Sequence, residues 1–280
     1  MQSEAIIKYK KKNIAQIYLN ISYSKAINKS QLVFYLSKDI EESAIGYAGF
    51  KTKYGLQKHL TQAIFDLKKI SRFPQFNFDK KKIVKIITNT IISCYKILPY
   101  RPAEIFVFPT FSKFVKKKMS GTTGYTPWKN TILIFINPSS STWEKALPAT
   151  IAHEFNHSVI LQYHQWRTLL DSLIFEGLAE HFIGDVINGK RALWTRSLSI
   201  KQSKKLFLEL KKYLYSKDSK LYQSIFFGDR KYRQWAGYTL GYYIVQSFIK
   251  NNPGFSWKRI VTLPPKEILQ KSNFIEKSPK

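Results

Sequence analysis

The sequence predicts an α+β protein, and three observations support this fold class. Two segments rich in β-branched and aromatic residues, 103–109 and 130–138, lie near the middle of the chain. Segments with apolar residues at helical spacing lie on both sides of them and do not alternate with strands, as they would in a parallel βαβ fold. With 280 residues, 44% of them hydrophobic, the chain can bury a sizeable core.

Residues 1–100 are expected to be mainly helical. A strand is predicted at 31–37 from its apolar and aromatic content. The next two segments, 56–70 and 79–98, are predicted helices, and the second ends before a proline. In the first of them the apolar residues recur at helical spacing, at positions 56, 60, 63, 64, 67 and 70.

Beyond residue 100 the predicted strands are followed by helices. The segment 120–128 contains two glycines and is predicted as a loop between the two strands. A helix is predicted over 148–164, with Pro148 in its first turn, where the missing N–H costs little. No segment has the length and composition of a linker, so residues 1–100 and 101–280 are expected to form one continuous domain. Three more helices are predicted, at 168–187, 198–215 and 232–250.

The formal net charge is +28, which is large for a chain of this size. Such a charge attracts nucleic acids, anionic membranes or acidic substrates. The sequence holds 38 lysines but only 8 arginines, and arginine is the residue favoured for planar recognition of phosphate. Without a nucleic-acid-binding motif, a nucleic-acid partner is not expected. The lysine runs at 8–12, 79–82 and 116–118 are scattered, which is typical of solvated faces and leaves open the steering of acidic substrates.

No secretory signal is expected, since Glu4 comes early and no apolar run of signal-peptide length follows it. The most apolar segment, 83–98, is interrupted by Lys85 and Lys96 and would bury charge if it crossed a bilayer. These observations favour a cytoplasmic protein and leave export by another route open. Cys94, the single cysteine, cannot form an internal disulfide and is expected in the core.

A metal site is predicted from the segment His153-Glu154-Phe155-Asn156-His157. Residues four apart lie on one helix face, about 6 Å apart along the axis, so His153 and His157 can direct two imidazoles at one ion. Glu154 lies beside that face and can take a proton from a metal-activated water. Two neutral nitrogen ligands with an adjacent carboxylate are the arrangement of a zinc hydrolase, so Zn²⁺ is the predicted cofactor.

Catalytic zinc usually has a third protein ligand, and the next predicted helix offers Glu176. It lies 19 positions after His157, which permits a turn and a second helix that folds back on the first. Glu180 follows four residues later on the same face. Its carboxylate could accept a hydrogen bond from the outer nitrogen of a ligand histidine, with His153 as the favoured partner.

The motif HExxH, followed after 18 residues by a glutamate in the context EGLA, resembles the gluzincin metallopeptidases. The chain also resembles a bacterial family of predicted Zn-dependent proteases, domain of unknown function 2268. The similarity covers roughly residues 100–250. It is carried by the segments GTTGYTP, TILIFIN, LPATIAHEFNH, EGLAEHF and GYTLGYY, of which HEFNH and EGLAE are the most specific.

This resemblance implies a zincin-like fold, in which a small mixed sheet has an edge strand over the HExxH helix and is surrounded by mostly helical N- and C-terminal parts. It implies a peptidase in which zinc is bound by His153, His157 and Glu176. Glu154 would be the general base. The substrate would be a peptide or protein.

The resemblance also assigns a place for the substrate. The strand 130–137 would be the edge strand along which an extended peptide could pair. Gly124, Tyr125 and Ile134 are the expected substrate contacts there, although Gly124 is also typical of a turn.

An electrophilic tyrosine is a further implication of the resemblance. Related aminopeptidase-type gluzincins carry one some sixty residues after the third ligand, and Tyr238 follows Glu176 by 62 positions. Its hydroxyl could stabilise the oxyanion that develops on the attacked carbonyl. Tyr242 lies one turn further on the same face, so helical periodicity does not separate the two. The segment GTTGYTPW lacks the carboxylate with which such aminopeptidases hold the substrate amine, which favours an endopeptidase.

The other three histidines are not expected to bind metal. His164 lies about 10 Å along the helix from His157, by the rise of an α-helix. His181 follows Glu176 by five positions, off the ligand face, and His59 stands alone. An alternative function stays open, namely a zinc-stabilised, catalytically silent protein that binds an anionic partner through lysine-rich faces. The oligomeric state, the natural substrate and the cleavage preference are not predicted.

Overall fold

The computed structural model describes residues 5–21, 30–31, 33, 53–65, 77–189 and 191–275. The chain divides into two compact units, Met1–Ser158 and Val159–Lys280. The division falls within one continuous helix. The expected organisation, with a mainly helical part before residue 101 and a metallopeptidase region after it, stays a prediction and does not coincide with this division.

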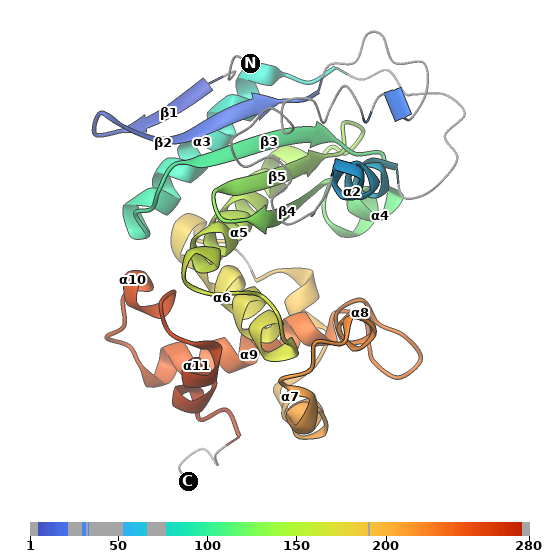
Figure 1. Cartoon of the computed structure of the whole chain (residues 1–280), viewed down its shortest axis with the longest axis vertical. Helices are drawn as coiled ribbons and strands as arrows, with labels where there is room; N and C mark the ends of the chain where they lie inside the picture. The colour runs from blue at the N-terminus through green and yellow to red at the C-terminus, as the bar shows by residue number, and fades with distance from the viewer. Residues whose placement is uncertain are drawn as a thin grey trace. The chain divides into compact units, whose positions relative to one another are not determined.

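The first unit is built on a mixed sheet of five described strands (Figure 1). Their order is β1-β2-β3-β5-β4. The two central pairs, β2 with β3 and β3 with β5, are parallel, and the outer pairs are antiparallel. The strands are β1 (Ala5–Tyr9), β2 (Lys12–Leu19), β3 (Ala103–Pro109), β4 (Thr122–Trp128) and β5 (Thr131–Ile136).

Two sequence predictions about this sheet are wrong. The segment predicted as a loop is strand β4, and its glycine and proline are tolerated because it lies at the edge of the sheet in the described part of the chain. Strand β5 is correctly predicted, but it is not an edge strand, since it pairs with β3 on one side and β4 on the other. A two-residue turn joins β4 to β5, and its Asn130 has φ 69°, a conformation that asparagine tolerates.

Helix α2 (Lys53–Phe65) covers one face of the sheet. Its Leu56, Leu60 and Ile64 are fully buried against a cluster that includes Phe106 and Leu133. The predicted helix at 56–70 is therefore confirmed up to Phe65, and its last residues lie outside the described part of the chain.

Helix α3 (Lys80–Ile97) contacts β1 and β2 and confirms the helix predicted at 79–98. Asp79 caps it by accepting a hydrogen bond from the backbone of Lys82. Its buried stripe includes Cys94, as predicted. Of the strand predicted at 31–37, only Gln31 and Val33 are described, and both are helical. Strands β1 and β2, by contrast, were not predicted.

Helix α5 (Trp143–Tyr163) carries the predicted metal motif and begins five residues earlier than predicted. Pro148 therefore lies inside the helix and not in its first turn. The cost is one missing N–H donor near the start of a 21-residue helix. A short helix, α4 (Lys113–Lys118), precedes β4.

The second unit is helical in its described residues. The predicted helix at 168–187 is α6 (Leu169–Ile187), which begins with a capping box formed by Thr168 and Asp171. The segment predicted at 198–215 is α7 (Ile200–Leu210) followed by a 3₁₀ turn, η2 (Lys211–Tyr213). The other elements are η1 (Leu193–Arg196), α8 (Ser219–Phe227), α9 (Ala236–Asn251), α10 (Trp257–Ile260) and α11 (Pro265–Ser272).

Two glycines let α6 and α9 pack with their backbones in contact. A Cβ atom on Gly177 would lie 2.7 Å from the carbonyl carbon of Gly241. A Cβ atom on Gly241 would overlap the carbonyl oxygen of Leu173. Because the obstacle is backbone in both cases, no rotamer change could relieve it. Gly177 and Gly241 thus allow α6 and α9 to pack with their backbones in direct contact.

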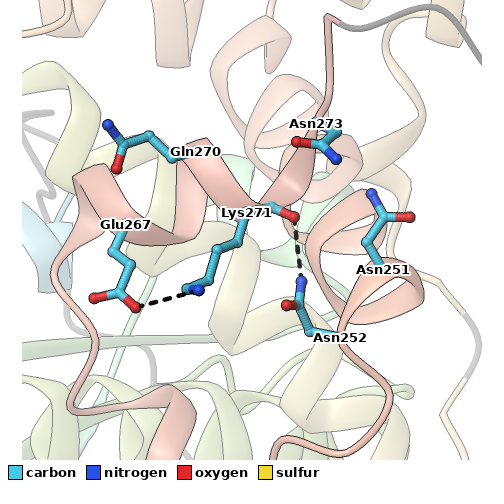
Figure 2. Close-up of a pocket in the computed structure, with 6 residues that line it drawn as sticks. All are labelled: Asn251, Asn252, Glu267, Gln270, Lys271 and Asn273. Carbon is cyan, nitrogen blue, oxygen red and sulfur yellow. Dashed lines mark hydrogen bonds and ion pairs between the residues drawn. The ribbon is translucent and has the colours of Figure 1, made fainter.

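A polar hollow of about 540 Å³ lies between the end of α9 and α11. Figure 2 shows two contacts among its lining residues: Asn252 donates to the carbonyl of Lys271, and the Lys271 ammonium lies 3.8 Å from the Glu267 carboxylate. Asn251 donates to the carbonyl of Ser272. The two asparagine contacts attach α11 to the end of α9. None of the residues predicted for the metal site lines the hollow.

No helix in the described part of the chain is long and apolar enough to cross a membrane.

We expect Gly241→Ala to destabilise the protein by about 2 kcal/mol or more, because the added methyl group forces two helix backbones apart. The control is Gly184→Ala on α6, where a Cβ atom meets nothing within 4 Å. There the gain in helix propensity should stabilise the protein by about 0.5–1 kcal/mol. Thermal or denaturant unfolding gives the change in the free energy of unfolding for each variant. Equal changes in the two variants would contradict the close packing of α6 and α9.

Burial lowers the pKa of His59 to about 4. Between pH 6.5 and about 4, His59 is protonated in the unfolded chain but neutral in the folded protein. The free energy of unfolding should therefore decrease as the pH is lowered through this range. The loss attributable to His59 should approach about 3 kcal/mol at the acid end. We expect His59→Phe, which cannot be protonated but keeps a ring against Tyr125 and Phe135, to flatten this part of the profile. The free energy of unfolding is measured by denaturant titration at several pH values. The same pH dependence in wild type and variant would refute the prediction.

Candidate metal centre

Helix α5 brings His153 and His157 together, one turn apart. Their Nε2 atoms lie 2.9 Å from each other, and the ring planes are nearly perpendicular, at 88°. Two nitrogen ligands of a tetrahedral zinc ion lie roughly 3.3 Å apart, from a Zn–N distance of about 2.0–2.1 Å. The observed separation is therefore close to the one that a shared metal ion requires.

Glu154 is 6% exposed and faces strand β4. One of its carboxylate oxygens accepts a hydrogen bond of 2.7 Å from the Thr126 hydroxyl. Gly124 lies against the same side chain: a Cβ atom at this position would overlap Glu154 Cγ and lie 2.7 Å from both Cδ and Oε1. The structure thus gives Gly124 a role that the sequence did not indicate, which is to leave room for Glu154.

Tyr125 and Ile134 occupy different settings. The ring of Tyr125 contacts the His59 ring at 4.5 Å and remains 39% exposed. Burial, with a smaller effect from the negative charge of Glu154, raises the pKa of Tyr125, so its hydroxyl is protonated at neutral pH. Ile134 is fully buried, and its strand neighbours are Val107 and Gly124. Its expected role at an edge strand therefore has no basis.

In the second unit, Glu176 and Glu180 lie one turn apart on α6, and both are buried. A carboxylate oxygen of Glu180 accepts a hydrogen bond of 2.7 Å from the indole N–H of Trp194. The expected hydrogen bond between Glu180 and a ligand histidine stays a prediction.

Among the described residues, His153, His157 and Glu176 form the group that could hold a metal ion. Each offers one ligand atom, and these atoms lie within 4.8 Å of one another. Two imidazoles and one carboxylate are a ligand set of catalytic zinc sites, in which a fourth position is left for water or substrate. The chemistry of the donors therefore fits the ion that the sequence predicts.

The two candidate tyrosines both lie on α9. Tyr238 packs its ring on the ring of Phe226, at 5.0 Å and 86°. Tyr242 contacts the His181 ring at 4.3 Å and the Arg191 guanidinium at 4.0 Å. Burial raises the pKa of Tyr242, which keeps its hydroxyl protonated and able to donate.

Two histidines predicted not to bind metal have other partners. His181 Nε2 donates to the backbone carbonyl of Tyr242, at 3.1 Å. His164 Nε2 lies 2.9 Å from the carbonyl oxygen of Val261.

Sequence reasoning missed Thr126 and Arg191. Thr126 is two residues after Gly124, so both lie on the same face of strand β4. This relation could not be used as long as the segment was predicted to be a loop. Arg191 hydrogen bonds to Thr195 and to the Tyr243 hydroxyl and lies over the Tyr242 ring. Nothing in its sequence context indicates these contacts.

Comparison with known proteins gives three results. The profile of the predicted Zn-dependent protease family, domain of unknown function 2268, matches residues 83–270, which include every candidate residue of the metal centre. The uncharacterized protein YjfC of Bacillus subtilis (strain 168) is 28% identical over an alignment of 149 positions, which covers 47% of this chain and 49% of that protein. The chain thus spans about half the length of this relative. No solved structure matches. Because the family profile covers well over half of the sequence, the chain belongs to the family of predicted Zn-dependent proteases known as domain of unknown function 2268.

Proposed function

We propose that the protein is a zinc-dependent endopeptidase of the gluzincin type. The observation that carries the proposal is the His153–His157–Glu176 group, in which three donors suited to zinc are clustered beside a buried carboxylate. The family of predicted Zn-dependent proteases supports the same assignment.

In this proposal His153, His157 and Glu176 hold the ion. Zinc bound there would polarise the scissile carbonyl and make a water molecule more acidic. Glu154 accepts a proton from the attacking water and delivers it to the leaving amine, as a general base and then a general acid. Its burial and its hydrogen bond to Thr126 support this role, because they limit the orientations that the carboxylate can adopt.

We further propose that a tyrosine of α9 donates a hydrogen bond to the developing oxyanion. Tyr238 remains the first candidate and Tyr242 the second. The contacts of Tyr242 with His181 and Arg191 support a fixed ring orientation, and its protonated hydroxyl can donate. Glu180 is proposed to orient a ligand histidine.

The substrate is proposed to be a peptide or protein cleaved within its chain. Strand β4 is the edge of the sheet nearest to Glu154, so an extended peptide would pair there and not along β5. Gly124 and Tyr125 belong to this strand and remain candidate substrate contacts. Endopeptidase activity is supported by the composition of β4, which has no carboxylate to hold a substrate amine.

Elemental analysis of the purified protein tests the metal assignment. We expect about one zinc per chain in the wild type, as for a single site, and a marked loss in Glu176→Gln. The control is Glu209→Gln, which removes a carboxylate from an exposed pair with Lys231 and should leave the zinc content unchanged. No zinc in the wild type after reconstitution would overturn the proposed function.

Glu154→Gln tests the general base. We expect this variant to keep its zinc and to lose hydrolysis of fluorescently labelled casein by roughly 10²–10⁴-fold, the usual contribution of a general base. Loss of zinc together with activity would instead give Glu154 a structural role. Zinc in both proteins with casein hydrolysis by neither would favour the catalytically silent protein that binds an anionic partner through its lysine-rich faces.

A further inference from the structure

Strand β4 presents two residues to Glu154 from alternate positions. Gly124 is paired with Ile134 of β5, and regular pairing is interrupted between Tyr125 and Trp128. Such an irregularity re-aims the side chains of the strand that contains it. Thr126 lies within it, and its hydroxyl is directed at Glu154.

The Thr126 hydroxyl has two acceptors on Glu154. It lies 2.7 Å from a carboxylate oxygen and 3.1 Å from the backbone carbonyl oxygen. A threonine hydroxyl has a single proton, and the shorter distance to a charged acceptor favours donation to the carboxylate. Within the described part of the chain, Thr126 is the residue that hydrogen bonds to this carboxylate. Both side chains are buried, so water competes little for the bond.

Because Gly124 has no side chain, the Glu154 side chain packs directly against the backbone of β4. The methylene and carboxyl carbons of Glu154 occupy the space that a Cβ atom at position 124 would fill. The carboxylate is thus bounded by the backbone of β4 and held at one oxygen by Thr126. Its other oxygen, Oε1, lies on the Gly124 side.

We propose that Thr126 is a positioning residue, whose hydroxyl fixes the carboxylate of Glu154 in the orientation needed for proton transfer. The inference rests on the proposed function, since Glu154 is the base only if the protein is a hydrolase. Glutamate has a flexible side chain, and one hydrogen bond at the carboxylate removes most of its alternatives. Residues that orient the groups at metal sites commonly affect activity by about 10–100-fold.

The test compares two substitutions of Thr126 with a control elsewhere. Thr126→Val keeps the shape of the side chain and removes the hydroxyl, and Thr126→Ser keeps the hydroxyl. Thr90→Val is the matched control, since it removes the hydroxyl of another buried threonine, which donates to the carbonyl of Ile86 within α3. Zinc content, kcat and KM for labelled casein are measured for each.

We expect Thr126→Val to retain zinc and KM and to lose kcat by about 10–100-fold. Thr126→Ser should recover most of the loss, and Thr90→Val should match the kcat and KM of the wild type. In a Glu154→Gln background Thr126→Val should cause little further loss, because no base remains to be positioned. A kcat of Thr126→Val equal to that of the wild type, or no recovery in Thr126→Ser, would overturn the proposal.

A second measurement does not depend on activity. Glu154→Met removes the acceptor while keeping an unbranched side chain of similar length. The melting temperatures of Thr126→Val, Glu154→Met and the double variant form a cycle, and the double variant should melt at a higher temperature than the sum of the single shifts predicts. Additive shifts would show that the contact is absent and would overturn the positioning role even in an active enzyme. If the melting-temperature shifts are non-additive but the zinc-loaded wild type cleaves no casein, the contact exists and the proposed function is wrong. The role of Thr126 in catalysis would then be wrong as well.

Discussion

The need to bury ionisable groups without losing their hydrogen bonds is the constraint on which this structure depends. Glu154, His157, Glu176 and Glu180 are each less than a tenth exposed. A buried carboxylate or imidazole is costly unless a donor, an acceptor or a metal ion faces it. On strand β4, the Thr126 hydroxyl donates a hydrogen bond to Glu154, and Gly124 leaves room for its side chain. The indole N–H of Trp194 donates to Glu180. The apolar core then serves to hold these partners in place.

The elements that sequence predicted best are those whose signals are local. The helices α3 and α6 have clear apolar spacing and recognisable caps, Asp79 and the Thr168–Asp171 box, and their bounds were predicted within one residue. The two histidines and Glu154 followed from helical geometry alone. Zinc as the cofactor and Glu176 as the third ligand depended on chemistry and on resemblance to a family, and the profile of that family matches this part of the chain.

The elements that sequence did not predict depend on long-range pairing. Strand β2 is polar at its start and is stabilised by pairing with β3, which lies more than eighty residues away. Strand β4 contains a glycine and a proline, residues that usually mark loops. Their presence in a strand is understood only from the three-dimensional structure, in which β4 is an edge strand of the described sheet. The glycine makes room for Glu154. The contacts of Arg191 with Tyr242 and Tyr243 likewise arise from residues some fifty positions apart, beyond the reach of any local pattern.

Pro127 has a consequence for the behaviour of β4 in solution. An edge strand with an open row of backbone donors and acceptors is a template for pairing with another copy of the same protein. Pro127 has no backbone N–H, and regular pairing with β5 is interrupted between Tyr125 and Trp128. A proline and an irregularity in the pairing are both devices with which natural sheets limit pairing between edge strands. These two features therefore make β4 a poor template for a growing sheet.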